Sequence, residues 1–406
     1  MSKTSARKLP LWKVIVFSLT PALLFFAIVE GAARIAWAYL EADAFAKHPY
    51  KIINFLEVPD PVLGYRLARN YDSGDRIYTR SIGRFQFRGV THIHTNANGY
   101  MQREEVVPSK RKDSLRIVTV GESTTQGGNV DQNYPSVLRD LIRSSTKYPG
   151  GAEVINAGVQ GYVSDQWTLL AERELAALRP DIVVLYAGWN DFQAYNPHTE
   201  APQKSWFEMP YSYWPEPAHW LRSLALLDAF LQKVKATSET AAESTNTVAT
   251  QTASIQTEAD HIRALYKFFL LNLDRTIAAF RNENKDVRIV ISTLVGRWPY
   301  ESESYFRDGE NSTWWMKTDK DDSKTAYQHL SRFNDLIREY AKQNGLILID
   351  TASRFESVKR EEIMHDFCHF TEVGSRMQAE TIFNGLRDEG LFKYEVAMPS
   401  PQSGTR

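Results

Sequence analysis

The stretch that decides the fold is residues 115–123, Leu-Arg-Ile-Val-Thr-Val-Gly-Glu-Ser. Its first six residues form a compact apolar run, which is typical of a short buried strand. The Gly-Glu-Ser turn comes directly after it, and a helical pattern then appears at Tyr134–Arg143. A strand that ends in Gly-x-Ser and leads into a helix places Ser123 at the carboxyl edge of a sheet. Open α/β folds bind their ligands at that edge.

The alternation of strands and helices continues along the chain. The other runs that read as buried strands are Glu153–Asn156, Asp181–Ala187, Arg288–Leu294 and Leu346–Ile349. The stretches with helical character between and after them are Ser164–Leu178, 259–284, 325–343 and 372–388. Strands separated by helices predict a parallel sheet covered by helices on both faces, so the expected fold class is α/β.

The N-terminus has the features of a membrane anchor. Residues Leu11–Val29 are nearly all apolar, and about 20 such residues cross the hydrocarbon core of a bilayer as a helix. The first 13 residues carry four basic side chains and no acid. The positive-inside rule therefore predicts a cytoplasmic N-terminus, a single pass through the cytoplasmic (inner) membrane, and a periplasmic location for the rest of the chain. We expect residues 1–40 to be a basic tip and an uncleaved signal anchor.

Two other interpretations of this segment are open. A buried core helix has the same composition. A cleaved signal peptide is the stronger alternative, because residues 29–33 (Val-Glu-Gly-Ala-Ala) offer small side chains at a suitable cleavage position. Against cleavage, apolar residues continue as far as Leu40, and Trp37 and Tyr39 suit an aromatic belt at the outer interface.

Three further segments differ from the α/β pattern. Residues 41–112 are rich in turn formers and short alternating runs, which predicts a β-rich subdomain or a belt on the main domain. Residues 200–257 interrupt the main domain and end in a stretch with almost no large apolar side chain, so a mobile insertion or the edge of a lid is expected there. Residues 393–406 are expected to be a disordered tail, which leaves 113–392 as the main domain.

The composition excludes several classes of protein. The net charge is −1, so no global charge favours nucleic acid as a partner. The single cysteine, Cys368, excludes an intramolecular disulfide and a multi-cysteine zinc site. An apolar content of 43% is ordinary for a globular protein. The chain therefore reads as one large globular domain with an N-terminal appendage.

Polar or glycine-containing loops come after the first three predicted strands. Ser123 comes after the first, although a serine there is commonly just a helix cap. Residues 156–161 (Asn-Ala-Gly-Val-Gln-Gly) come after the second, where a glycine either bares a backbone N–H to a cleft or makes a tight turn. Asn190, after the third, offers either an amide donor or another helix cap. Each feature alone is weak, but all three lie at the same edge of the sheet.

An acid and a histidine come after the last strand. Asp366 and His369 are three residues apart in one loop, so the carboxylate can orient the imidazole and stabilise it when charged. His365 neighbours the same acid and is a rival base. Cys368, between the pair, is read as a buried and inert thiol.

These loops, in this order, resemble the blocks of the SGNH hydrolase superfamily, the GDSL-type esterases and lipases, over roughly residues 113–390. The resemblance implies a flavodoxin-like three-layer α/β/α sandwich. It implies that Ser123 is the nucleophile and that Asp366 and His369 are its acid–base partners. It further implies an oxyanion hole from the N–H groups of Ser123 and Gly161 and the amide of Asn190. One departure is that Glu122 stands where the family usually has aspartate, a change that bears on loop geometry.

The implied reaction is ester hydrolysis through an acyl-enzyme, with no metal or organic cofactor. The expected substrate is an acylated glycan or a lipid-like ester outside the membrane. Two alternatives remain: an O-acyltransferase that uses the same triad, and a non-catalytic glycan-binding or assembly protein that keeps the fold. Aromatic side chains also suggest an acceptor cleft, although core packing is their commoner use. These are Trp189, Phe192, Tyr195 and the aromatics of 206–220.

Overall fold

The computed structural model describes residues 10–47, 56–60, 62–82, 85–196, 201–202, 221–224, 226–227, 230, 258–297 and 323–394. The chain divides into two compact units. One comprises Met1–Tyr65 and Pro210–Val248, and the other Arg66–Met209 and Ala249–Arg406. Most of the insertion expected at 200–257 and nearly all of the tail expected at 393–406 lie outside the described residues, and the domain boundaries stay predictions.

A five-stranded parallel sheet forms the centre of the larger unit. Its strands, in spatial order, are β6 (Ala152–Asn156), β5 (Leu115–Gly121), β7 (Ile182–Tyr186), β10 (Arg288–Ser292) and β11 (Ile347–Ile349). Every residue of β5 and of β7 is buried, as the apolar runs predict for strands covered on both faces. This is the flavodoxin-like strand order, and the expected fold class is confirmed.

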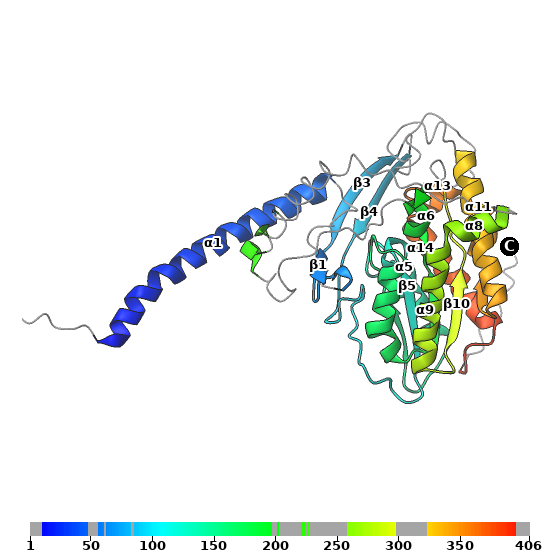
Figure 1. Cartoon of the computed structure of the whole chain (residues 1–406), viewed down its shortest axis with the longest axis horizontal. Helices are drawn as coiled ribbons and strands as arrows, with labels where there is room; N and C mark the ends of the chain where they lie inside the picture. Colours follow the sequence, from blue (N-terminus) through cyan, green and yellow to red (C-terminus); the bar gives the residue numbers. More distant parts are fainter. Residues whose placement is uncertain are drawn as a thin grey trace, which may run out of the picture. The chain divides into compact units, whose positions relative to one another are not determined.

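Helices cover both faces of this sheet (Figure 1). The connection from β5 to β6 runs through α4 (Tyr134–Ser145), whereas the later connections run in the opposite direction across the sheet. Since parallel crossovers are right-handed, α4 lies on one face. The helices α5 (Ser164–Leu170), α9 (Lys267–Glu283) and α11 (Ser323–Gln343) lie on the other. The last helix, α14 (Glu372–Asp388), packs beside α4.

The reversal of direction between β5 and β7 creates a topological switch point. At such a point the loops after the two strands diverge to opposite faces and leave a crevice at the carboxyl edge of the sheet. The two strands are paired in register, with Val118 opposite Val183 and Gly121 opposite Tyr186. The loops that begin at Glu122 and Ala187 therefore start side by side.

The helical predictions hold with two refinements. The stretch predicted at 164–178 begins as α5 and continues through a π turn, Ala171–Leu175, and a 3₁₀ turn, Ala176–Leu178. The stretch predicted at 259–284 is two helices, α8 (Glu258–Leu265) and α9, which are separated at Tyr266. Short helices complete the unit: α3 (Ser123–Gln126), α6 (Trp189–Ala194), α12 (Thr351–Arg354) and α13 (Arg360–Ile363).

A β-rich stretch precedes the main sheet. The strands β3 (Arg76–Ile82) and β4 (Phe85–Thr91) form an antiparallel hairpin, labelled in Figure 1, and contain the short strands expected from the sequence. Two other pairs are shorter: β1 (Glu57–Asp60) with β2 (Gly64–Leu67), and β8 (Tyr195–Asn196) with β9 (Ala201–Pro202). After β4, the backbone of His92 bonds to the loop after α3: its N–H donates to Gly128 (3.2 Å), and its carbonyl accepts from Val130 (2.8 Å).

The smaller unit contains one long helix, α1 (Leu11–Lys47). Its segment Phe17–Tyr39 has the length and apolar composition of a membrane span, with a mean hydropathy of 1.6. Among the described residues, 6% of that window is buried. Glu30, within α1, accepts hydrogen bonds from the backbone N–H groups of Arg222 (3.0 Å) and Ser223 (3.1 Å).

Candidate active site

The turn after β5 brings Ser123 to the carboxyl edge of the sheet. A side chain at Gly121 would lie 2.3 Å from the carbonyl oxygen of Tyr186 and 2.2 Å from the hydroxyl of Thr125, so only glycine fits there. Glu122 is the N-cap of α3 and makes no side-chain cap, and Ser123 is the first helical residue. The serine hydroxyl therefore does not cap the helix, which was its alternative interpretation.

Ser123, His369 and Asp366 are joined by hydrogen bonds. Oγ of Ser123 lies 2.8 Å from Nε2 of His369, across 246 residues of sequence. Nδ1 of the same imidazole lies 2.8 and 2.9 Å from the two carboxylate oxygens of Asp366. Because the carboxylate accepts the Nδ1 hydrogen, Nε2 is left to accept the serine hydrogen. This is the arrangement of a nucleophile, a base and the acid that orients the base.

The loop that carries the acid and the histidine is held by its backbone. Asp366 accepts hydrogen bonds from the backbone N–H groups of Cys368 (3.0 Å) and His369 (2.8 Å). The fully buried guanidinium of Arg297 donates from Nη1 to the carbonyl of Met364 (2.8 Å). The backbone N–H of the same residue donates to the carbonyl of Phe367 (3.0 Å). Both bonds tie the loop after β11 to the loop after β10. The imidazole is therefore positioned by its loop as well as by Asp366.

The two other reactive side chains of this loop take different positions. The backbone N–H of His365 donates to the carbonyl of His369 at 2.7 Å, whereas the ring of His369 is the one at Ser123. Sγ of Cys368 lies 3.4 Å from Nδ1 of His369, and the residue is only 1% exposed. The geometry favours His369 over His365 as the base and agrees with a buried cysteine.

The loops that hold Gly161 and Asn190 contact the turn of Ser123 and each other. The N–H of Val159 donates to the carbonyl of Gly121 (3.2 Å). The amide nitrogen of Asn190 donates to the carbonyl of Tyr162 at 2.8 Å, so the side chain is fixed beside the glycine loop. Gly161 has φ +76°, in the left-handed region that favours glycine. This conformation agrees with a tight turn and equally with a backbone N–H that faces a cleft.

Two backbone donors at this edge have no hydrogen-bond acceptor among the described residues. They are the N–H groups of Ser123 and Gly161. Both residues are half-buried, so these donors are open to an incoming anion at this edge of the sheet. The amide of Asn190 carries a second hydrogen on the same nitrogen. Their assignment as an oxyanion hole stays a prediction.

Glu122 links the turn of Ser123 to the loop after β7. Its Oε1 accepts the N–H of Gly188 at 2.7 Å, and the residue is fully buried. Burial raises the pKa of Glu122 to about 8, and the nearby carboxylate of Asp191 adds to the shift. Burial likewise raises the pKa of Asp191 to about 7, although it accepts hydrogen bonds from the hydroxyl (2.5 Å) and the N–H (2.9 Å) of Ser164. Neither link can be inferred from the sequence alone.

The raised pKa of Glu122 predicts a pH dependence of stability. A carboxyl whose pKa is higher in the folded than in the unfolded state stabilises fully below the unfolded pKa, near 4.3, and less as the pH rises towards the folded pKa. The free energy of unfolding should therefore fall between about pH 5 and 8. Glu122→Gln, which mimics the neutral acid, should flatten part of this fall, on the order of a few kcal/mol.

Urea denaturation at four pH values between 5 and 8 measures this effect. The matched control is Glu380→Gln, which removes an exposed acid from α14 and should keep the wild-type slope. Asp191 keeps some pH dependence in every variant. A Glu122→Gln slope equal to that of the wild type contradicts the assignment.

Most of the aromatic side chains near the site are core residues. Trp189 and Phe192 are 1% and 0% exposed, and their rings meet edge to face with centroids 5.7 Å apart. The ring of Trp189 also meets Phe367 edge to face, and the ring of Phe367 in turn meets the imidazole of His369 edge to face. Core packing, the commoner use, therefore applies to these two. The side chain of Tyr195 and the aromatics of 206–220 lie outside the described residues.

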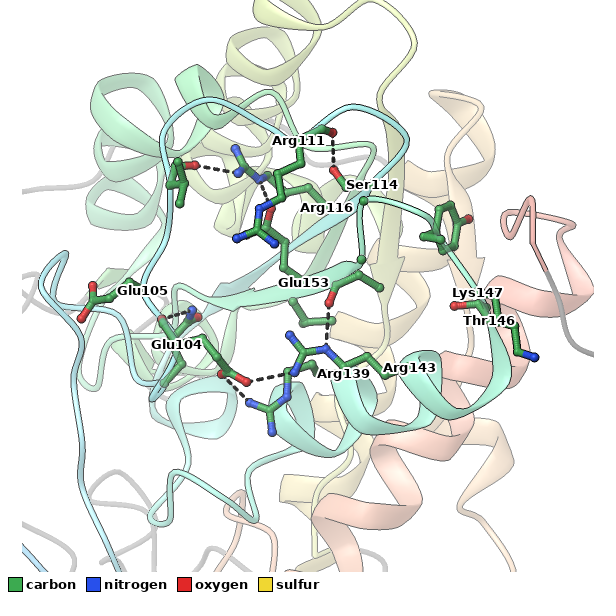
Figure 2. Close-up of a pocket in the computed structure, with 17 residues that line it drawn as sticks. Glu104, Glu105, Arg111, Ser114, Arg116, Arg139, Arg143, Thr146, Lys147 and Glu153 are labelled. Carbon is green, nitrogen blue, oxygen red and sulfur yellow. Dashed lines mark hydrogen bonds and ion pairs between the residues drawn. The ribbon is translucent and has the colours of Figure 1, made fainter.

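A cavity of about 450 Å³ lies at the opposite, amino end of β5 and β6 (Figure 2). Arg139 and Arg143 reach from α4 to the two carboxylate oxygens of Glu104, at 2.8 and 2.9 Å. The buried Arg116 donates to Glu153 at 2.7 Å. These ion pairs brace the wall of the cavity. The reactive residues lie at the other end of the strands.

Comparison with known proteins gives a family match over most of the chain. A model of the GDSL-like lipase/acylhydrolase family matches residues 119–377. No curated protein matches the sequence. A lipase/acylhydrolase from Enterococcus faecalis is similar in structure, with a TM-score of 0.40 and 16% identity over 70% of this chain and 100% of that one. A catalytic mutant of an acetylxylan esterase from Geobacillus stearothermophilus has a TM-score of 0.40 and 13% identity over 72% and 100%.

Proposed function

The chain belongs to the GDSL-like lipase/acylhydrolase family and is a carboxylic ester hydrolase. We propose that it hydrolyses its substrate through an acyl-enzyme on Ser123, at the outer face of a membrane. The observation that carries the proposal is the chain of hydrogen bonds from Ser123 through His369 to Asp366. A serine is a weak nucleophile unless an adjacent base takes its proton, and this arrangement supplies that base.

The proposed reaction has two halves. Nε2 of His369 accepts the Ser123 proton while Oγ attacks the ester carbonyl, and Asp366 stabilises the imidazolium that forms. The N–H groups of Ser123 and Gly161 and the amide of Asn190 hold the negative oxygen of the tetrahedral intermediate. His369 then protonates the leaving alcohol. Water attacks the acyl-enzyme in the second half, with His369 again as the base.

Asn190→Ala tests the proposed amide donor. Loss of one oxyanion-hole donor is expected to lower kcat about 10²- to 10³-fold with little change in KM, because the bond forms mainly in the transition state. Asn190→Asp is the matched variant, since it keeps the size and removes the amide hydrogens. Steady-state kinetics on an activated acetyl ester measures both, with the melting temperature as a check on the Tyr162 contact. A kcat near wild type in both variants contradicts the role.

Composition alone allows the window Phe17–Tyr39 as the span, and the polar contacts of Glu30, which lies inside that window, favour the earlier apolar run 11–29 as the part of α1 that crosses the hydrocarbon core. Residues 11–29 would span about 28 Å as a helix, close to the thickness of a hydrocarbon core. Glu30 pairs with Arg34 at 2.8 Å and accepts the backbone N–H groups of Arg222 and Ser223, which are contacts suited to the interface or to water. Large apolar side chains before that point are exposed, among them Phe17, Leu23, Phe25 and Phe26.

Two measurements test the location. The full chain should stay in the membrane fraction after alkaline washing, and the mature protein should begin before residue 11. A mature N-terminus near residue 33 would mean that the segment is a cleaved signal peptide.

The acceptor of the acyl group separates the hydrolase from its main alternative. A site at the outer face of a membrane has access to acylated glycans and to lipid-like esters. The experiment supplies an activated acetyl ester with and without a glycan acceptor and monitors the products. We expect free acetate in both arms. Acetyl transfer to sugar hydroxyls at the expense of acetate would favour an O-acyltransferase with the same triad. A second screen of acetylated sugars against long-chain acyl esters identifies the substrate class.

A further inference from the structure

A second group of chemically competent side chains lies outside the active site. Among the described residues, two groups of histidine, cysteine or acidic side chains bring their ligand atoms within 4.8 Å of one another. One is the loop of Asp366 and His369 itself. The other is Asp72, His92 and His94, which nothing in the proposed reaction uses.

The three side chains of this second group converge on one point. Nε2 of His92 lies 3.0 Å from one carboxylate oxygen of Asp72, and Nδ1 of His94 lies 3.0 Å from the other. A tetrahedral zinc ion with bonds of about 2.0–2.1 Å needs ligand atoms about 3.3 Å apart. The two contacts to Asp72 are a few tenths of an ångström shorter than this spacing, so both would lengthen when an ion binds. Two imidazoles and one carboxylate are a ligand set that zinc and related divalent metals prefer.

A second carboxylate orients the first imidazole. Nδ1 of His92 lies 2.6 Å from Asp75, so its hydrogen points away from Asp72 and the lone pair of Nε2 points towards it. Metal-binding histidines almost always donate their other N–H to such a partner. In a neutral His92 oriented in this way, the lone pair of Nε2 faces the carboxylate oxygen of Asp72, so two acceptors meet unless a cation lies between them. The metal-free alternative is an imidazolium that donates to both carboxylates.

The backbone around the cluster is fixed. Asp72 and His94 form an isolated antiparallel bridge outside the named strands, with the N–H of Ser73 donating to the carbonyl of Ile93 and the N–H of Thr95 to the carbonyl of Tyr71, each at 2.9 Å. The side chain of Asp72 also accepts the N–H of Gly74 at 2.7 Å. The ligands therefore come from a preformed frame, as a metal site requires.

The charges around the cluster favour a dication. Asp72, Asp75 and Asp131 bring three carboxylates, whereas Arg103 brings one guanidinium, which pairs with Asp131 at 2.7 Å and approaches Nδ1 of His92 at 3.4 Å. Arg76 brings a second guanidinium, whose Nε donates to the carbonyl of Ser73 beside Asp72 at 3.1 Å, so the carboxylates outnumber the guanidinium groups by one. We propose that Asp72, His92 and His94 bind one divalent transition-metal ion, of the zinc class, with Asp75 as a positioning residue.

The position of the site suggests what the metal does. His92 is bonded through its backbone to Gly128 and Val130, in the loop after the helix of Ser123. Asp72 precedes the β3–β4 hairpin, and His92 and His94 come after it. A bound ion therefore fastens the two ends of the hairpin to each other, next to the loop behind the nucleophile. This is a structural role, separate from the ester chemistry.

The test uses the full chain in detergent, without a histidine tag and stripped with a chelator. Zn²⁺ titrated by calorimetry should bind at one ion per chain, and elemental analysis should find the same ratio. Zn²⁺ at 100-fold its dissociation constant should raise the melting temperature by several degrees. His94→Ala should abolish this binding. Asp75→Asn should weaken it about 10- to 100-fold, since outer-sphere partners of metal-bound histidines contribute that much.

The controls keep the proposal falsifiable. Asp75 is 77% exposed, so Asp75→Asn should fold even if His94→Ala does not. Asp286→Asn, which removes an exposed acid before β10, should bind Zn²⁺ as the wild type does. No Zn²⁺ uptake by the stripped protein, or uptake that is the same in both cluster variants as in the wild type, overturns the proposal. The imidazolium alternative predicts equal melting temperatures with Zn²⁺ and with chelator.

Discussion

Ser123→Ala is expected to lower kcat for ester hydrolysis on the order of 10⁶-fold and to leave the fold intact. The hydroxyl is the atom that would carry the acyl group, so its removal leaves only the oxyanion donors and substrate binding to accelerate the reaction. Ser123 contributes no helix cap, and its side-chain bond is to His369. The change should therefore cost little stability.

Hydrolysis of an activated acetyl ester measures this effect, with the melting temperature as the control for folding. Thr125 supplies a matched variant, because its hydroxyl is buried in the same short helix and bonds to the carbonyl of Tyr186 at 3.0 Å. Thr125→Val should lower stability and retain most of kcat. Activity of Ser123→Ala within about 10-fold of the wild type would exclude Ser123 as the nucleophile.

His369→Ala is expected to lower kcat by a similar factor, while His365→Ala keeps most of it. The ring of His369 lies 2.8 Å from the serine oxygen and also contacts the Asp366 carboxylate. The two histidines lie in one loop, so each variant controls for disturbance of the loop by the other. Because nucleophile and base act as a unit, Ser123→Ala combined with His369→Ala should be no slower than either alone.

The kinetics of the two histidine variants decide between the candidate bases. Loss of activity in His365→Ala together with near-wild-type activity in His369→Ala would reassign the base to His365. A double variant much slower than both single variants would show that serine and histidine act independently, contrary to the proposed relay.

Much of the fold could be predicted from local pattern. The apolar runs of β5 and β7 are buried on both faces, and such strands have few alternatives. Their order in the sheet agrees with the resemblance to a flavodoxin-like fold. The separation of α8 from α9 at Tyr266 could not be predicted, because the apolar spacing runs on through the break.

The parts that sequence could not supply depend on long-range contacts. Glu122 meets Gly188 across 66 residues, and only the packed sheet shows that its carboxyl is buried. The cluster of Asp72, His92 and His94 joins residues about 20 apart, whose register depends on the isolated bridge between Asp72 and His94. The pair His92 and His94, two residues apart, is the sequence pattern that could have indicated the cluster, since alternate residues of an extended segment share a face. The expectation that no metal is required concerned the reaction, and the proposed metal lies outside it.

The most direct test of the proposed mechanism is whether Ser123 reacts as a nucleophile in the folded protein. A serine-directed phosphonate ester is incubated with the wild type, with Ser123→Ala and with His369→Ala, and intact mass spectrometry and peptide mapping locate the adduct. We predict one adduct per wild-type chain, located on Ser123, no adduct in Ser123→Ala and a greatly slowed reaction in His369→Ala. An unmodified Ser123 in folded wild type, under conditions that label a known serine esterase, would contradict the mechanism.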